Sequence, residues 1–136
     1  MATVTINLAA LERIAEEKAV AGIQRAALAG EAITKVNLSR PGTGRVYPRG
    51  NGKTHQASAP GEPPAPDMGE LRRMTQADTK VRREGSDLVG RVVQNKEYAH
   101  ALAVGTEKMA PRPSLQLLAT DHADQLREAF ITGASE

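Results

Sequence analysis

Three histidines, His55, His100 and His122, are the side chains best suited to acid–base or metal chemistry near neutral pH. Asp121 and Asp124 flank His122, but neither has the i, i+4 helical spacing that directs two ligands at one metal ion. His100 has no acid at a productive spacing, and His55 lies in a Pro/Gly-rich segment without fixed oxyanion donors. The chain also has no cysteine. We therefore expect no catalytic residue, metal ligand or cofactor site, and we expect that the protein is not an enzyme.

The triplet Gly52, Lys53 and Thr54 is similar to the end of a phosphate-binding loop. That loop needs a glycine five residues before its Gly-Lys pair, where this chain has Tyr47, and a buried strand in front of it. Neither requirement is met, so the triplet does not indicate nucleotide binding.

Residues 39–66 form a basic arm that holds six of the eight prolines and five glycines. Proline removes backbone donors and glycine increases the entropy lost on ordering, so we expect neither helix nor strand here. A loop of this length in a compact domain usually serves as a binding arm, a lid or a linker. The arm has one acid, Glu62, against the cations Arg40, Arg45, Arg49 and Lys53. These cations either contact DNA or an acidic protein surface, or are simply solvated.

The elements that position this arm begin with a helix predicted over residues 7–36, with Asn7 as its N-cap. One face of this helix is made of small and apolar residues, which allow another backbone to approach closely. We expect this stripe to contact the protein's own sheet, and a subunit interface is the alternative. Its members are Leu8, Ala15, Ala19, Gly22, Ile23, Ala26, Ala29, Gly30 and Ile33.

The rest of the chain predicts an α+β fold in a single domain, 1–136, with a small antiparallel sheet flanked by the long N-terminal helix and a C-terminal helix. A helical turn begins at Asp67, and strands over 79–84 and 88–94 form a hairpin through Gly85 and Ser86. A helix is expected over 95–104, extended chain over 109–113 and a last helix over 115–131, capped by Ser114.

The predicted core is thin, because Leu, Ile, Val and Phe together number only 26 of 136 residues. This is about the fraction at which packing within one chain becomes insufficient. The net charge of only +2 does not favour a disordered chain. We infer that the domain gains part of its stability from copies or partners. No run approaches the roughly 18 apolar residues needed to span a membrane, so no membrane contact is expected.

Five motifs occur in an order that resembles the small neck or tail-component proteins of long-tailed double-stranded DNA phages, which take part in joining heads to tails. They are SRPGTGR at 39–45 with Tyr47, HQASAPGEPP at 55–64, DMGELRR at 67–73, Tyr98-Ala99, and GTEKMAPRP at 105–113. The family usually has an acid and an aromatic residue before the Gly-Thr pair and an aromatic after the Arg-Pro pair; this chain has Ala103, Val104 and Ser114 there.

The resemblance implies a structural virion protein, located in the neck and in the host cytoplasm during assembly. Its partners would be copies of itself in a ring (a hexamer), the adjacent head-side connector and tail-side proteins, and DNA in the channel. The implied contact residues are Arg40, Arg45, Arg49, Lys53, Arg72, Arg73 and Arg112, and the implied motif residues are Tyr98, Gly105, Thr106, Met109, Pro111 and Pro113. Arg112 would serve a partner carboxylate or an internal salt bridge. The alternative is a nucleic-acid-binding module that contacts phosphates through the arm.

Overall fold

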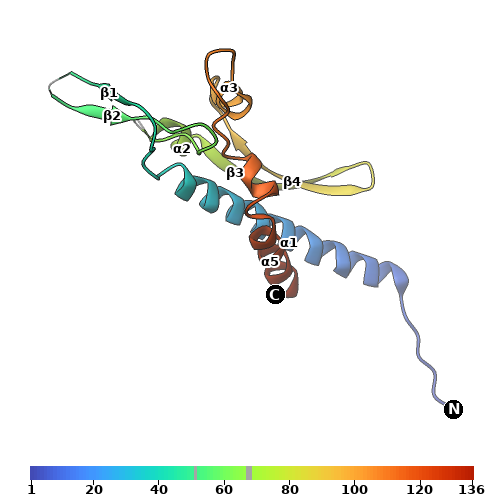
Figure 1. Ribbon diagram of the computed structural model, residues 1–136. Coiled ribbons are helices and arrows are strands. Elements are labelled where there is room, and N and C mark those ends of the chain that lie inside the picture. The colour runs from blue at the N-terminus through green and yellow to red at the C-terminus, as the bar shows by residue number, and fades with distance from the viewer. Residues whose placement is uncertain (51, 67–68) are drawn as a thin grey trace.

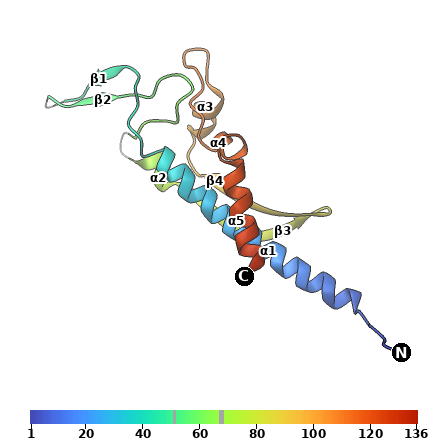
Figure 2. The same ribbon diagram turned by 60° about the horizontal axis from the view of Figure 1, so that its bottom comes forward.

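The computed structural model describes residues 1–50, 52–66 and 69–136, and its architecture is α+β, as predicted. The central element is the 30-residue helix α1 (Leu8–Asn37). Two elements pack along it: the hairpin of β3 (Thr75–Glu84) and β4 (Asp87–Gln94), and the helix α5 (Ala123–Ser135). A second hairpin, β1 (Val46–Pro48) and β2 (Thr54–Gln56), projects from one end, and residues 1–7 project from the other (Figures 1 and 2).

Helix α1 confirms the prediction for residues 7–36 to within a residue. The side chain of Asn7 accepts a hydrogen bond from the amide of Ala10 at 3.1 Å, which satisfies one of the free amides of the first turn. The C-terminal half of α1 is covered by the sheet and α5, with Gly22, Ala27, Gly30 and Thr34 buried. Residues 8–18 are exposed except for Ala10, so the N-terminal part of α1 extends beyond the body.

The small-residue stripe on α1 contacts both the sheet and α5. Gly30 lies against Val92 of β4, which confirms the expected contact with the protein's own sheet. Gly22 lies against Phe130 of α5, and Gly133 lies against the backbone of Ala21 and Gly22, a helix–helix contact that was not predicted. The members of the stripe nearest the N-terminus, Leu8 and Ala15, remain exposed.

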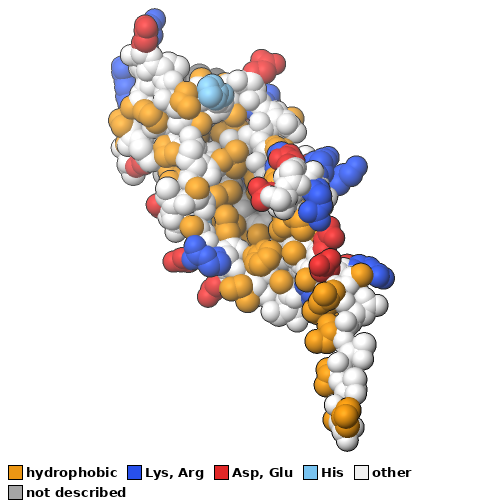
Figure 3. Space-filling view, turned by 90° about the vertical axis from the view of Figure 1, so that its right-hand side faces the viewer, with side chains coloured by type: hydrophobic (Ala, Val, Ile, Leu, Met, Phe, Trp, Pro, Cys, Tyr) orange, Lys and Arg blue, Asp and Glu red, His pale blue; other side chains and the backbone are white. Residues whose placement is uncertain are grey.

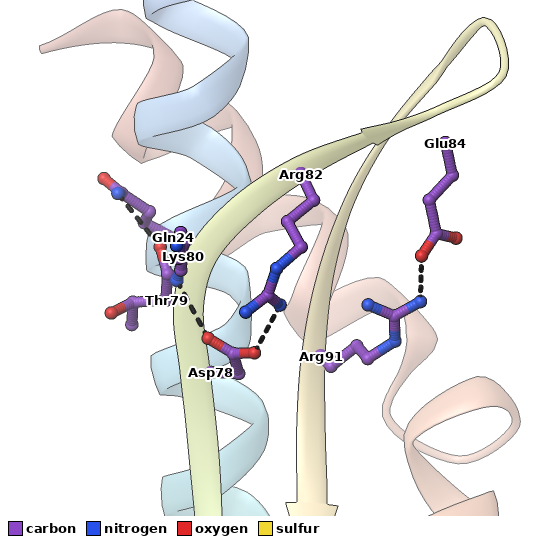
Figure 4. A network of polar contacts seen from close by, with 7 residues as sticks. All are labelled: Gln24, Asp78, Thr79, Lys80, Arg82, Glu84 and Arg91. Atoms are coloured by element: carbon purple, nitrogen blue, oxygen red, sulfur yellow. Dashed lines mark hydrogen bonds and ion pairs between the residues drawn. The ribbon is translucent and has the colours of Figure 1, made fainter.

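The predicted hairpin is present, with Gly85 in the left-handed conformation (φ 62°) at its turn. Strand β3 begins at Thr75, four residues earlier than predicted. The register shifts between Asp78 and Arg82, and the Asp78 carboxylate stabilises this irregularity by accepting from the amide of Lys80 at 3.1 Å and from Arg82 at 2.7 Å (Figure 4).

The single helix predicted over 115–131 was wrong. Two helices, α4 (Gln116–Ala119) and α5, are separated at Thr120–His122, where the amide of His122 bonds to the carbonyl of Leu117 at 3.0 Å. The break lets His122 accept from Asn37 of α1 at 3.1 Å. Ser114 is not an N-cap; it is buried, and its hydroxyl accepts from Gln94 at 2.9 Å.

The expectation that residues 39–66 contain no strand was wrong for β1 and β2, which pair antiparallel. Proline is tolerated in β1 because the amide of Arg49 donates to the carbonyl of Lys53 at 2.7 Å, which makes Pro48 and Thr54 a non-hydrogen-bonded pair. The missing amide of Pro48 would therefore point away from β2.

Two further helices are short. Helix α2 (Glu70–Arg73) lies in the predicted helical turn, but Asp67, its predicted start, is outside the described residues. Helix α3 (Ala99–Val104) begins four residues later than the predicted 95. Gly105 ends it with φ 81°.

The core is as thin as the composition indicates. Among the described residues, the buried hydrophobic side chains are only Ala27, Leu38 and Leu71. Large apolar side chains are instead exposed, including Ile6 (65%), Leu8 (68%), Leu11 (54%) and Ile14 (54%) around the start of α1. Figure 3 shows hydrophobic atoms along the projecting end of the molecule.

Candidate partner-binding groove

A groove of about 960 Å³ lies between the basic arm and the segment 98–112. Its walls are mainly apolar, and its charged lining consists of the cations Arg72, Lys108 and Arg112 and the acid Glu70, which is paired with Lys96. The volume is at the upper end of the range for small-molecule sites, and the groove also fits a peptide segment. Its apolar and aromatic lining includes Leu38, Tyr47, Leu71, Tyr98, Leu102 and Met109.

Arg112 holds the two walls of the groove together. Its Nε donates to the carbonyl of Ser58 at 3.2 Å, and its Nη1 donates to the carbonyl of Ala110 at 2.7 Å. Its backbone amide donates to the carbonyl of Leu102 at 2.6 Å, and the carbonyl of Pro111 accepts from the amide of Gly61 at 3.0 Å. The guanidinium therefore satisfies backbone carbonyls of the arm and of its own loop, rather than an internal carboxylate.

Glu62 closes the arm on itself, and sequence reasoning did not identify this role. Its carboxylate accepts from the amides of Ala59 (2.9 Å) and Thr43 (3.1 Å) and from the Thr43 hydroxyl. These bonds, that from the Thr43 hydroxyl first, lower the pKa of Glu62 below its ordinary value of 4.5. The sequence did contain one indication of this role: Glu62 is the arm's one acid, and a carboxylate is a strong acceptor for backbone amides.

The base of the arm also requires glycine. A Cβ built on Gly42 would lie 2.2 Å from the carbonyl oxygen of Ala57, and one on Gly44 would lie 2.5 Å from that of Ser58. The amide of Gly44 donates to Ala57 at 2.8 Å in this contact. The arm is thus a closed loop with a hairpin at its tip, and its two strands approach too closely at the base for any side chain.

The motif residues of 98–113 make a compact loop that lines the groove. Thr106 and Met109 exchange backbone hydrogen bonds of 2.8 and 3.2 Å. Gly105 is required there, because its φ is 81° and a Cβ would lie 2.9 Å from the carbonyl of Met109. Pro111 and Pro113 lie outside any helix or strand, and Tyr98 is 42% exposed beside the groove. The structure therefore brings the arm motifs and the 98–113 motifs together.

The predicted contact cations do not form one cluster. Arg45, Arg49 and Lys53 are on or beside the projecting β1–β2 hairpin, where Arg45 lies 5.1 Å from the ring centroid of Tyr47. Arg72 and Arg73 are on α2, whereas Arg40 follows the end of α1. All six are exposed. In the part of the chain that the structure describes, the side chains of Arg40, Lys53 and Arg72 make no hydrogen bond or ion pair.

The three histidines lie in different elements: β2, α3 and the turn before α5. His122 bonds to Asn37 through Nε2 and to the Gln125 side chain through Nδ1 (2.5 Å), which assigns the proton to Nδ1. His55 is in β2, and His100 is exposed on α3. Within residues 1–50, 52–66 and 69–136, no three potential metal ligands cluster, and no helix is long and apolar enough to cross a membrane.

Comparison with known proteins gives no match to this chain among family models, curated proteins or solved structures.

Proposed function

We propose that this protein is a non-enzymatic structural subunit of a phage neck, which joins head and tail by assembling with copies of itself as a ring around the DNA channel. The observation that carries the proposal is that few apolar side chains are buried and many large ones are exposed. Among the described residues only three hydrophobic side chains are buried, whereas Val4, Ile6, Leu8, Leu11 and Ile14 are each at least 54% exposed. A chain of this kind is stabilised when neighbours cover its surface.

The groove and the arm suit contacts between layers of such a neck. The groove presents apolar walls with cations at the lining, so it fits a segment of the head-side connector or of a tail-side protein that carries both apolar and acidic residues. The β1–β2 hairpin projects from the body (Figure 2), so its exposed cations are accessible to a partner or to DNA. The motifs support this assignment, since Tyr47, Tyr98 and members of the motifs at 55–64, 67–73 and 105–113 line one groove.

The proposed role is tested by removing the protein from the phage that encodes it. We expect full heads and complete tails that remain unjoined, and we expect the purified protein to restore joining. Complete, infectious particles without the protein would contradict a joining role. Antibody labelling in electron micrographs of wild-type particles should mark the neck, and labelling elsewhere on the particle would also contradict it.

A second function is favoured by the exposed cations, of which Arg40, Lys53 and Arg72 have no side-chain partner among the described residues. These residues suit a small nucleic-acid-binding module that contacts phosphates. Binding of duplex DNA to the isolated protein, measured over a range of salt concentrations, separates the two functions. A steep decrease in affinity with salt supports the module, and no measurable binding by the isolated subunit supports the neck protein.

A further inference from the structure

The outer edge of β3 is already occupied by side chains of α1. The amide of Ala77 donates to the Glu31 carboxylate at 2.9 Å, and the carbonyl of Thr79 accepts from Gln24 at 3.1 Å. Figure 4 shows the Gln24 contact at this edge. Since these backbone groups point away from β4, another strand cannot pair there without displacing Glu31 and Gln24.

The same bonds define the direction of the backbone groups of β4. Ala77 lies opposite Val92, and its amide is directed to Glu31, so the two form a non-hydrogen-bonded pair. The amide of Asn95 donates to the carbonyl of Met74 at 3.1 Å, so these two residues form a hydrogen-bonded pair and the next pair, Thr75 and Gln94, is again non-hydrogen-bonded. The amide and carbonyl of Val92 therefore point outward, and the alternation places those of Gly90 outward too. In the described residues this sheet has two strands, so the outer edge of β4 has no strand beside it.

An apolar cleft adjoins β4 on its α1 side. It has a volume of about 190 Å³ and is lined by α1, β4 and Leu126 of α5. Its apolar lining includes Ile23 of α1, Val92 of β4 and Leu126 of α5. Gly30 and Gly90 also belong to the lining, and their lack of side chains allows α1 and β4 to approach closely. A strand added to β4 would direct every second side chain toward this cleft.

Residues 2–7 have the alternating pattern of a strand with one apolar face. Ala2, Val4 and Ile6 alternate with Thr3, Thr5 and Asn7, and β-branched residues are enriched in strands. Val4 is 86% exposed and Ile6 is 65% exposed. This segment is not in a helix or a strand, and it projects beyond α1 without packing on the body (Figures 1 and 2).

We propose that residues 2–7 of one copy add to the outer edge of β4 of a neighbouring copy as a third strand, with Val4 and Ile6 over the cleft. The inference deepens the proposed function and rests on it, since it names the contact that joins subunits. Strand addition of this kind gains affinity from main-chain hydrogen bonds and specificity from alternate side chains. Because donor and acceptor are different surfaces of one chain, the contact is heterologous, and it forms a ring when the rotation between successive copies closes.

The geometry favours a neighbouring copy over the same chain. Ile23 of α1 contacts Gly90, and the 15 steps from Leu8 to Ile23 span about 22 Å of helix. Residues 2–7 would have to reverse at Asn7 and lie along this whole length to reach the cleft. The extended conformation of Asn7 (φ −88°, ψ 103°), which supports its cap on Ala10, instead directs the chain away from the helix.

Two variants test donor and acceptor separately. Deletion of residues 2–6 removes the donor and keeps the Asn7 cap. Val92→Pro removes an outward amide that β3 does not use, and Val92→Ala is the matched control because it loses the same contact with Gly30 but keeps the amide. We expect each of the deletion and Val92→Pro to reduce the mass from oligomer to monomer, with far-UV circular dichroism unchanged. The control should stay oligomeric. If both variants assemble like the wild type, the strand addition is wrong although a ring-forming subunit stands. A wild-type protein that is itself monomeric overturns both.

Disulfide trapping tests the neighbour directly and does not depend on a destabilising variant, since the chain has no native cysteine. Adjacent strands bring Cα atoms to about 4.5–5.5 Å, within disulfide range. Thr5→Cys mixed with Arg91→Cys should give a cross-linked heterodimer on mild oxidation. Thr5→Cys mixed with Lys80→Cys, on the occupied β3 edge, should not. Equal yields from the two mixtures overturn the proposal, as does a chain carrying both T5C and R91C that cross-links only within itself.

Discussion

The contact between α1 and α5 makes a sharp prediction for Gly22→Ala. A Cβ at position 22 would lie 2.7 Å from both the Phe130 ring and the Phe130 carbonyl oxygen. Ordinary contacts between non-bonded carbon atoms are about 3.5–4.0 Å. The ring alone could rotate, but the carbonyl belongs to the backbone of α5, so the helix would have to move by about 1 Å.

Two opposing terms decide the sign of the change. Alanine in the interior of a helix is favoured over glycine by about 1 kcal/mol. Overpacking a close contact costs about 1–3 kcal/mol, so we expect a net loss of about 1 kcal/mol in the free energy of unfolding and a fall in Tm of about 3–5 °C for a domain of this size. Gly22→Leu should lose more.

Gly30→Ala is the matched control within the same helix. The nearest atoms there are side-chain tips, Val92 Cγ2 at 3.0 Å and Leu118 Cδ1 at 3.2 Å, which can yield. The gain in helix propensity should then prevail, with no loss of stability. Urea unfolding followed by circular dichroism at one protein concentration measures both variants. If Gly22→Ala is stabilised as much as Gly30→Ala, the close contact with α5 does not exist.

Three further outcomes concern the arm and the exposed cations. Gly42→Ala should separate the base of the arm, because its Cβ would lie 2.2 Å from the Ala57 carbonyl; we expect faster proteolysis within residues 39–66 and little change in Tm, and unchanged cleavage would contradict the close approach. Because the pKa of Glu62 is lowered in the folded chain, its stabilisation of the arm is complete above about pH 5 and is lost as the pH falls through that lowered value; the protection of the Thr43 and Ala59 amides against hydrogen exchange, relative to their intrinsic exchange rates, should fall in that acidic range, and Glu62→Gln should show no such pH dependence. Replacing Arg40, Lys53 and Arg72 together with glutamine should leave self-assembly unchanged in a neck protein, whereas a large loss of DNA affinity with a smaller salt slope would favour the nucleic-acid module.

The elements with strong local signals could be predicted from the sequence. Asn7 followed by a long small-residue stripe defined α1, and the β-branched run with Gly85 at the turn defined the β3–β4 hairpin. Both depend on periodicity and turn chemistry, which are local properties. The α+β class followed from these elements.

The departures depend on contacts between distant residues, which local patterns do not contain. The break between α4 and α5 is accompanied by the contact of His122 with Asn37, 85 positions away. Ser114 has the right type for a cap, but its hydroxyl is used by Gln94. Strand β1 includes a proline, and only the pairing register shows that its missing amide is not needed.

The groove was partly predictable. The resemblance named motif residues in both the arm and 98–113, but it did not predict that the two segments pack together; contacts of Arg112 and of Gly61 with Pro111 join them. The role of Glu62 depends on amides at positions 43 and 59, whose approach requires the folded arm. The cations on the β1–β2 hairpin lie apart from those on α2, a separation that composition alone cannot reveal.

The mass of the purified wild-type protein in solution, measured by light scattering on a size-exclusion column, tests self-assembly most directly. The account predicts a closed oligomer whose mass is a multiple of 14.5 kDa, with about 87 kDa expected for six copies. A single 14.5 kDa species that stays folded and monomeric at every concentration tested would contradict it.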